Sequence, residues 1–99
     1  MTVKTWNNGN PNNETGAGYG IKVNIEDFNT LEHWEILIVG NNNINRGNLI
    51  FNINCREIRH RIIGIFLIEN NLNNWEYGEP NVLYVHEIRQ NVFELKTTD

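Results

Sequence analysis

The stretch Asn54–Leu72, NCREIRHRIIGIFLIENNL, decides the fold class of this chain, because it is long enough for a helix and apolar enough for a buried strand. At 100° per residue, one apolar face collects Cys55, Ile58, Ile62, Ile65, Phe66 and Leu72. Asn54 is a suitable N-cap, and Glu57 stands where a capping box places its Glu. We therefore expect a helix near residues 55–72.

Two features of the same stretch favour a strand instead. Ile63, Leu67 and Ile68 fall away from the apolar face of the helical projection. Gly64 costs a helix about 1 kcal/mol relative to Ala. A buried strand over Ile62–Glu69 is therefore the alternative to the helix.

The polar part of the stretch concentrates positive charge. Arg56, Arg59, His60 and Arg61 hold three of the eight Lys and Arg residues, in a chain of net charge −4. Cations are unfavourable at a helix N-terminus, where the backbone dipole is already positive. One interpretation is a contact surface for an anion or a partner. The other is neutralisation within the fold, for example by a Glu57–Arg61 pair at i,i+4.

The residues before this stretch predict four strands. The clearest is Tyr19–Ile25, in which Tyr19, Ile21, Val23 and Ile25 alternate with smaller or polar residues. The other three are Val3–Trp6, Trp34–Val39 (apolar on both faces), and a strand through Leu49, Phe51 and Ile53. We expect the second, third and fourth strands to form a meander with polar turns, one of them the Asn-rich connector Gly40–Gly47.

The residues after it predict a hairpin. Val82–Ile88 and Val92–Lys96 have strand composition, and Arg89–Gln90–Asn91 provides the turn between them. The expected fold is α+β: a mostly antiparallel sheet of about six short strands in the order ββββαββ, with the one helix packed on one face. Residues 1–99 form a single domain in this interpretation.

Composition excludes several classes of function. The chain has no Ser, which excludes a serine nucleophile, and its single Cys55 excludes an internal disulfide and a multi-cysteine zinc site. No apolar run approaches the roughly 18–20 residues that cross a bilayer, so we expect no membrane contact. The N-terminus lacks the apolar segment of a signal peptide, and we expect a cytoplasmic protein.

No catalytic or ligand-binding motif stands out. His33, His60 and His86 are too far apart in sequence for a short metal motif. The run Gly16–Gly20 precedes a strand, whereas a phosphate-binding loop follows one. We therefore expect no metal, no cofactor and no catalytic residues. A small enzyme remains an alternative only if a pocket joins His60 or His86 to a buried Glu.

Aromatic residues flank the two longest loops, Asn7–Gly18 and Trp75–Pro80. Trp34 is expected in the core, whereas Trp6, Trp75 and Tyr77 either cap the core or form a hot spot for a partner. The sequence does not decide whether Asn7–Gly18 is a functional loop or a merely mobile one.

These observations favour a small cytosolic binding or regulatory module, inhibitor- or immunity-like, that is non-catalytic and acts through a protein partner. The acidic balance favours a basic partner. The alternative is nucleic-acid or nucleotide binding through the Arg56–Arg61 patch. The candidate contact surface comprises Arg56, Arg59, His60, Arg61, Trp6, Trp75 and Tyr77.

Overall fold

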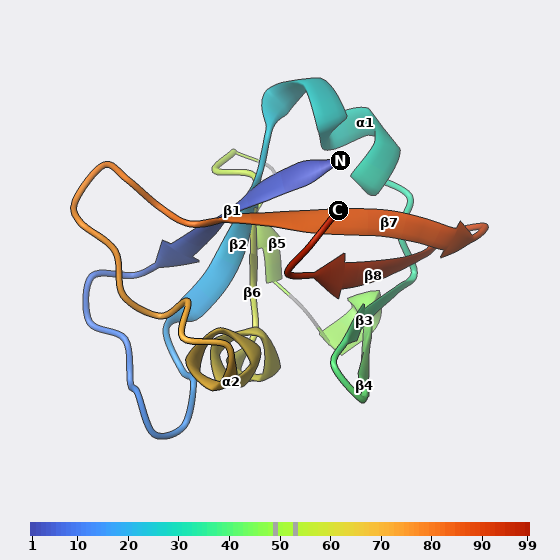
Figure 1. Ribbon diagram of the computed structural model, residues 1–99. Helices are drawn as coiled ribbons and strands as arrows, with labels where there is room; N and C mark the ends of the chain where they lie inside the picture. The colour runs from blue at the N-terminus through green and yellow to red at the C-terminus, as the bar shows by residue number, and fades with distance from the viewer. Residues whose placement is uncertain (49, 53) are drawn as a thin grey trace.

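The computed structural model describes residues 1–48, 50–52 and 54–99, and for 48 and 50–52 it describes the backbone alone. It is a small α+β domain built on one curled, mixed sheet (Figure 1). The strands are β1 (Thr2–Asn7), β2 (Tyr19–Val23), β3 (Ile36–Val39), β4 (Asn42–Asn45), β5 (Ile50–Asn52), β6 (Glu57–Arg59), β7 (Val82–Arg89) and β8 (Val92–Lys96). The helices are α1 (Phe28–Leu31) and α2 (Arg61–Glu69), with single 3-10 turns η1 (Ile25–Asp27) and η2 (Arg46–Asn48).

The strand order, over the described residues, is β4-β3-β8-β7-β1-β2-β6-β5. Neighbouring strands are antiparallel except for β3 and β8, which are parallel. Helix α2 contacts both β2 and β3, although β8, β7 and β1 separate these strands in the sheet, so the sheet curls around the helix (Figure 1). The expected α+β class with a mostly antiparallel sheet is confirmed.

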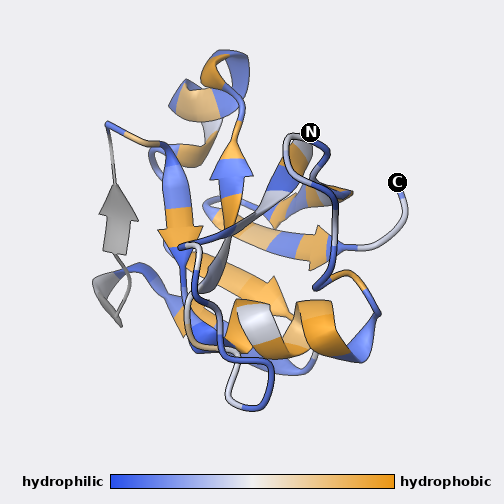
Figure 2. Ribbon diagram, turned by 90° about the vertical axis from the view of Figure 1, so that its left-hand side faces the viewer, coloured by the Kyte–Doolittle hydropathy of each residue, from blue (hydrophilic) through white to orange (hydrophobic). Residues whose placement is uncertain are grey.

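Alternation along the strands determines where the core lies. Val3, Ile21 and Ile58 are at most 1% exposed and belong to one apolar cluster with Ile63 and Leu67 of α2. Figure 2 shows α2 and the strand segments around it as the most hydrophobic parts of the chain, with polar loops outside. Burial of this apolar surface, at about 25 cal/mol per Å², is the main favourable contribution to folding.

The C-terminal hairpin forms as expected. Strands β7 and β8 pair antiparallel, and Asn91 occupies the turn with φ 63°, a left-handed conformation that Asn tolerates better than most residues. The alternating strand at Tyr19 also forms, but it ends at Val23. Ile25, expected on its buried face, begins η1 and is 70% exposed, because the chain has already left the sheet.

The expected meander is wrong. Strand β3 does not pair with β2; η1 and α1 carry the chain to the other end of the sheet, where β3 pairs with β8. The expected strand after residue 48 is present as β5, but Leu49 and Ile53 lie outside the described residues. The connector Gly40–Gly47 contains strand β4, because Ile44 is buried and the backbone pairs with β3. Pairing here overrides the poor strand propensity of Asn.

The stretch at 54–72 contains both of the elements considered. A helix is confirmed over Ile62–Glu69, but α2 begins only at Arg61, and the residues before it form β6. The expected cap at Asn54 is therefore wrong, and Glu57 is not part of a capping box but lies in β6.

The predicted apolar face also has the wrong phase. Helix α2 buries Ile63, Gly64 and Leu67, and Cys55 is exposed in the turn before β6. The physical reason is long-range pairing: β6 joins β2 and β5 through ladder hydrogen bonds that no helical projection includes.

Candidate functional site

The candidate site lies on the face of β1, β2 and β6 that points away from the core. Trp6, Gly20 and Arg59 are ladder partners in one row across these three strands. Lys4, Lys22 and Glu57 form the next row in the same way. Because side chains alternate between faces along a strand, all six residues lie on the side opposite the buried Val3, Ile21 and Ile58.

The guanidinium group of Arg59 stacks over the ring of Trp6. Its Cζ atom lies 5.4 Å from the ring centroid, within the range of a cation–π interaction. The two residues are two strands apart, and Gly20, which has no side chain, stands between them. A Cβ atom at Gly20 would collide with the carbonyl oxygen of Ile58. Glycine at this position therefore permits both the close strand packing and the reach of Arg59 to Trp6.

Arg59 is also held from its other side by Glu57. Glu57 Oε1 lies 3.5 Å from Arg59 Nε, and the Glu57 side chain is only 8% exposed. Arg59 Nε itself is buried and donates no hydrogen bond to the described residues. The pair balances a carboxylate that would be costly to bury alone. The expected Glu57–Arg61 pair does not form, because the two residues belong to different elements.

His60 forms the N-cap of α2. Its Nδ1 atom accepts a hydrogen bond of 3.0 Å from the backbone N–H of Ile62. Burial lowers the pKa of His60 below its usual 6.5, and the neighbouring charge of Arg61 lowers it further. A proton on Nδ1 would remove the capping acceptor, so the neutral form with its proton on Nε2 is favoured.

A pocket of about 380 Å³ opens beside these residues. We call it the Arg59 pocket; its lining consists of Trp6, Asn8, Ala17, Gly18, Tyr19, Arg59, His60 and Arg61. The loop Asn7–Gly18 supplies one wall, and the junction of β6 and α2 supplies the other. The pocket thus brings together one of the predicted aromatic residues and three of the four predicted basic ones.

Contacts within the fold fix the loop wall. A Cβ atom at Gly64 of α2 would collide with the backbone of Gly16, so the loop and the helix touch through two glycines. Asn13 Oδ1 accepts hydrogen bonds from the hydroxyl of Tyr19 and from Asn73 Nδ2, the latter at 3.1 Å. The loop is therefore anchored at Asn13 and at Gly16. The glycine at position 64 lowers helix propensity, but it allows this close packing of the two backbones.

A second, wider pocket of about 700 Å³ lies on the other side of Trp6. We call it the Trp75 pocket; its lining consists of Lys4, Thr5, Trp6, Asn7, Lys22, Trp75, Tyr77, Gly78 and Pro80. Trp75 is half-buried and packs edge-to-face on Tyr19, with ring centroids 6.4 Å apart. Tyr77 is fully exposed. Trp75 therefore both covers the core and lines a pocket, whereas Tyr77 covers nothing.

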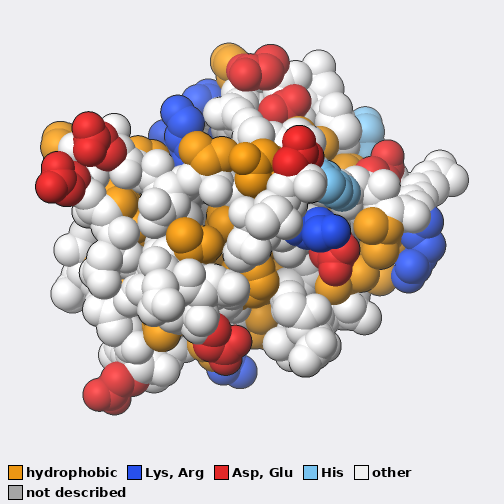
Figure 3. Space-filling model, in the orientation of Figure 1, with side chains coloured by type: hydrophobic (Ala, Val, Ile, Leu, Met, Phe, Trp, Pro, Cys, Tyr) orange, Lys and Arg blue, Asp and Glu red, His pale blue; other side chains and the backbone are white. Residues whose placement is uncertain are grey.

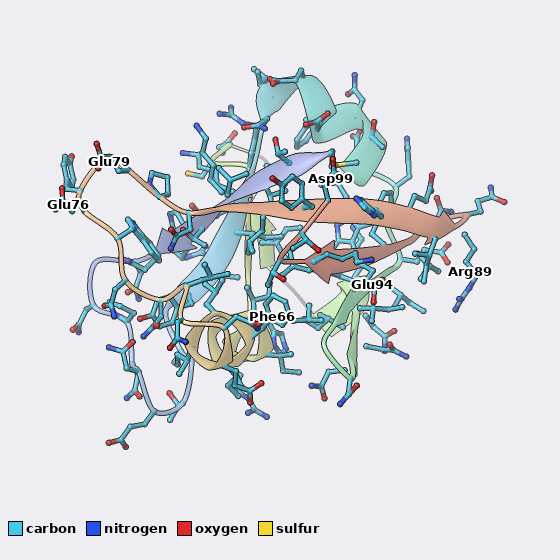
Figure 4. The ribbon with its side chains drawn as sticks, viewed as in Figure 1. Phe66, Glu76, Glu79, Arg89, Glu94 and Asp99 are labelled. Carbon is cyan, nitrogen blue, oxygen red and sulfur yellow. The ribbon has the colours of Figure 1, made fainter. Side chains whose placement is uncertain are left out.

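The linings of the two pockets are basic, although Glu57 lies beside them, 3.5 Å from Arg59. Four of the chain's eight Lys and Arg residues line them, and no Asp or Glu among the described residues does. Glu76 and Glu79 project from the outer end of the loop before β7 (Figure 4), and Figure 3 shows acidic side chains at this left-hand edge of the molecule. We call Lys4, Trp6, Lys22, Arg59, His60, Arg61, Trp75 and Tyr77 together the Trp6 surface.

Arg56 does not belong to the Trp6 surface. It has φ 57°, its carbonyl accepts from the Val23 N–H, and its Nε donates to the Val23 carbonyl at 3.3 Å. Its role is in the turn before β6. Lys4 and Lys22 were not among the predicted contact residues; the alternation of β1 and β2 places them beside Trp6 once the strands are paired.

The described residues hold no cluster of three or more His, Cys, Asp or Glu able to bind a metal ion. The Arg59 pocket contains His60 without a carboxylate in its lining. The Nε2 atom of His86 lies 3.1 Å from the carboxylate of Asp99, near the C-terminus. Glu94, the cross-strand partner of His86, lines a third hollow to which His86 does not contribute; Figure 4 labels Glu94 and Asp99. The hypothesis of an enzyme required a pocket that joins His60 or His86 to a buried Glu. Neither the Arg59 pocket, nor the Trp75 pocket, nor the third hollow has such a lining.

No helix in the described part of the chain is both long and apolar enough to span a membrane. No protein-family model, no curated protein and no solved structure matches the chain. The function is therefore argued from the Trp6 surface alone.

Proposed function

We propose that the protein is a small non-catalytic binding module that holds a protein partner on the Trp6 surface. The observation that supports this most is the position of Trp6, which lines two pockets at once with Trp75 and Tyr77 beside it. Trp, Tyr and Arg are the residue types that dominate binding energy at protein interfaces. An inhibitor- or immunity-like role in the cytoplasm would suit a module of this size.

The local charge of the surface favours an acidic segment on the partner. The net charge of −4 favours a basic partner, but that charge is spread over the whole chain. Charges separated by more than about 8 Å are largely screened at physiological salt. Lys4, Lys22 and Arg61 are exposed at the pockets themselves, and Glu57, the carboxylate beside them, is paired with Arg59, so the local charge still favours an anionic group on the ligand.

The test is capture of a partner by the tagged protein from native lysate, followed by calorimetry with the purified partner. Tyr77→Ala combined with Arg61→Gln should weaken binding at least about tenfold, because both side chains are exposed and at the pockets. Arg89→Gln is the matched control, since Arg89 is an exposed cation at the far end of β7 (Figure 4). Loss of binding in both variants, or in neither, would contradict the proposal.

Single-stranded nucleic acid is the second candidate, because aromatic side chains interleaved with Lys and Arg can stack bases and hold phosphates. Trp6 with Arg59, and Trp75 with Lys4 and Lys22, are such combinations. Fluorescence anisotropy with a labelled oligothymidine tests it at low salt. Binding that falls steeply with added salt supports this candidate, and absence of binding at low salt removes it.

A further inference from the structure

Within the Trp6 surface, two neighbouring side chains hold Arg59 in place. Trp6 supports one face of its guanidinium group, and Glu57 stands 3.5 Å from its Nε edge. The side chain is still 37% exposed. No described residue bonds to its two terminal nitrogens, so this edge of the planar group remains open. A guanidinium edge presents two parallel N–H donors, which match the two oxygens of a carboxylate.

A second cation stands next to it. Arg61 is exposed, lines the same pocket and forms no ion pair with any residue that the structure describes. His60 lies between them in sequence, and its capping bond leaves the Nε2 proton free to donate. The remaining wall consists of Ala17 and Gly18 of the anchored loop and Tyr19 of β2, and it is shaped before any ligand arrives. Groups ordered in advance lose less entropy when they bind.

We infer that the Arg59 pocket receives a carboxylate of the partner, an Asp or Glu side chain, on the open edge of Arg59 with Arg61 beside it. This inference rests on the proposed function and names the chemical group that the partner presents. Glu57, 3.5 Å from Arg59 Nε, repels the several charges of a polyanion more than it repels one carboxylate, so a nucleic-acid phosphate is the less favoured occupant. At about 380 Å³, the pocket also has room for the methylene groups of Glu and part of the next residue.

The experiment is an NMR titration of the ¹⁵N-labelled protein with a capped Gly-Glu-Gly peptide, with capped Gly-Gln-Gly as its neutral match. The Glu peptide should shift the indole N–H of Trp6, the Nε–H of Arg59 and the amide of Gly18 saturably, with Kd on the order of 1 mM to 10 mM. Arg61→Gln should weaken this binding about threefold. Arg59→Lys keeps the charge but loses the planar double donor, and should weaken it about tenfold. Arg89→Gln should leave it unchanged.

Several results would overturn the inference. Equal shifts with the Gln peptide would show that no carboxylate is recognised. A saturable response to inorganic phosphate or oligothymidine, without one to the Glu peptide, would assign the pocket to phosphate. Partner capture that needs Tyr77 but is unchanged by Arg59→Lys and Arg61→Gln would leave the proposed function intact and remove this inference alone. Melting temperatures of each variant distinguish a lost contact from a lost fold.

Discussion

The two faces of β1, β2 and β6 have the same backbone and opposite roles. On the inner face, Val3, Ile21 and Ile58 are at most 1% exposed. On the outer face, their sequence neighbours Lys4, Lys22 and Arg59 belong to the Trp6 surface. The side-chain period of a strand is two residues, so a shift of register by one would exchange the faces. The inner face thus stabilises the fold by burial, whereas Lys4 and Lys22 on the outer face stay exposed to solvent.

The largest effect is expected from Ile58→Ala, which removes a fully buried side chain from the inner face of β6. We expect the free energy of unfolding to fall by about 4 kcal/mol, from lost burial and the cavity left behind. Ile25→Ala is the control, because Ile25 is 70% exposed and should change stability by less than about 0.5 kcal/mol. Urea unfolding measures both; similar losses in the two variants would mean that the core has been assigned wrongly.

Gly64→Ala tests whether the inner packing shapes the outer pocket. The new Cβ atom would collide with the Gly16 backbone. We expect a loss of about 2 kcal/mol, because overpacking costs about 1–3 kcal/mol and is only partly offset by the better helix propensity of Ala. Amide signals of the loop wall, including Gly18, should shift. Gly47→Ala is the matched control, with open space around it; a stable Gly64→Ala variant with an unmoved loop would argue against the contact.

Thr5→Val tests the one polar side chain described on the inner face of β1. Thr5 is 3% exposed, and its hydroxyl accepts a hydrogen bond of 2.9 Å from the Asn81 N–H. Valine keeps the shape but leaves that donor without its partner, which should cost about 1–2 kcal/mol. Thermal unfolding provides the measurement. A variant as stable as the natural chain would show that this bond contributes little to holding the loop before β7.

His60→Ala should cost about 1 kcal/mol, the usual effect of removing a helix N-cap. The natural chain should also lose stability at acidic pH. The folded protein binds the His60 proton less readily than the unfolded chain, because the folded pKa is lowered. This contribution is therefore fully present above pH 6.5, the unfolded pKa, and is lost as the pH falls through the lower folded pKa.

His60→Asn is the control for the pH effect, since Asn caps helices well and does not titrate in this range. Below pH 6.5, the free energy of unfolding of this variant should change less with pH than that of the natural chain. Guanidinium unfolding at a series of pH values compares the two. Identical pH dependence would mean that another group controls it.

The smallest effect on stability is expected on the outer face. Arg61→Gln and Tyr77→Ala change exposed side chains and should each alter the free energy of unfolding by less than about 0.5 kcal/mol. Both should nonetheless reduce partner binding. A loss of stability comparable to that of Ile58→Ala would show that the two faces are not separate in function.

Local pattern was enough for some elements and not for others. The hairpin β7–β8 follows from two strand segments and a short turn, all close in sequence. The helix over Ile62–Glu69 was predicted, but from a cap at Asn54 and an apolar face that α2 does not have. Strand β6 could not be predicted, because its three residues form a strand only through pairing with β2 and β5.

The candidate site shows the same division. Residue type alone suggests one candidate contact surface that includes the aromatic and the basic residues, but it does not say how they lie relative to one another. The members that line the two pockets are Trp6, Trp75, Tyr77, Arg59, His60 and Arg61. Arg56 was included because it lies close in sequence to Arg59, His60 and Arg61, but in the structure it belongs to the turn before β6. Lys4 and Lys22 were missed because neither is unusual until β1 and β2 are paired beside Arg59.

The sequence by itself determined the α+β class, the absence of serine and disulfide chemistry, and the residues available for binding, since these depend on composition and on short periodicities. Tertiary structure alone decided that β6 precedes α2, that β3 pairs with β8, and that Gly20 brings Arg59 over Trp6. Each of these depends on hydrogen bonds and packing between residues far apart in the chain. A one-dimensional pattern contains the side chains but not the contacts that select among their arrangements.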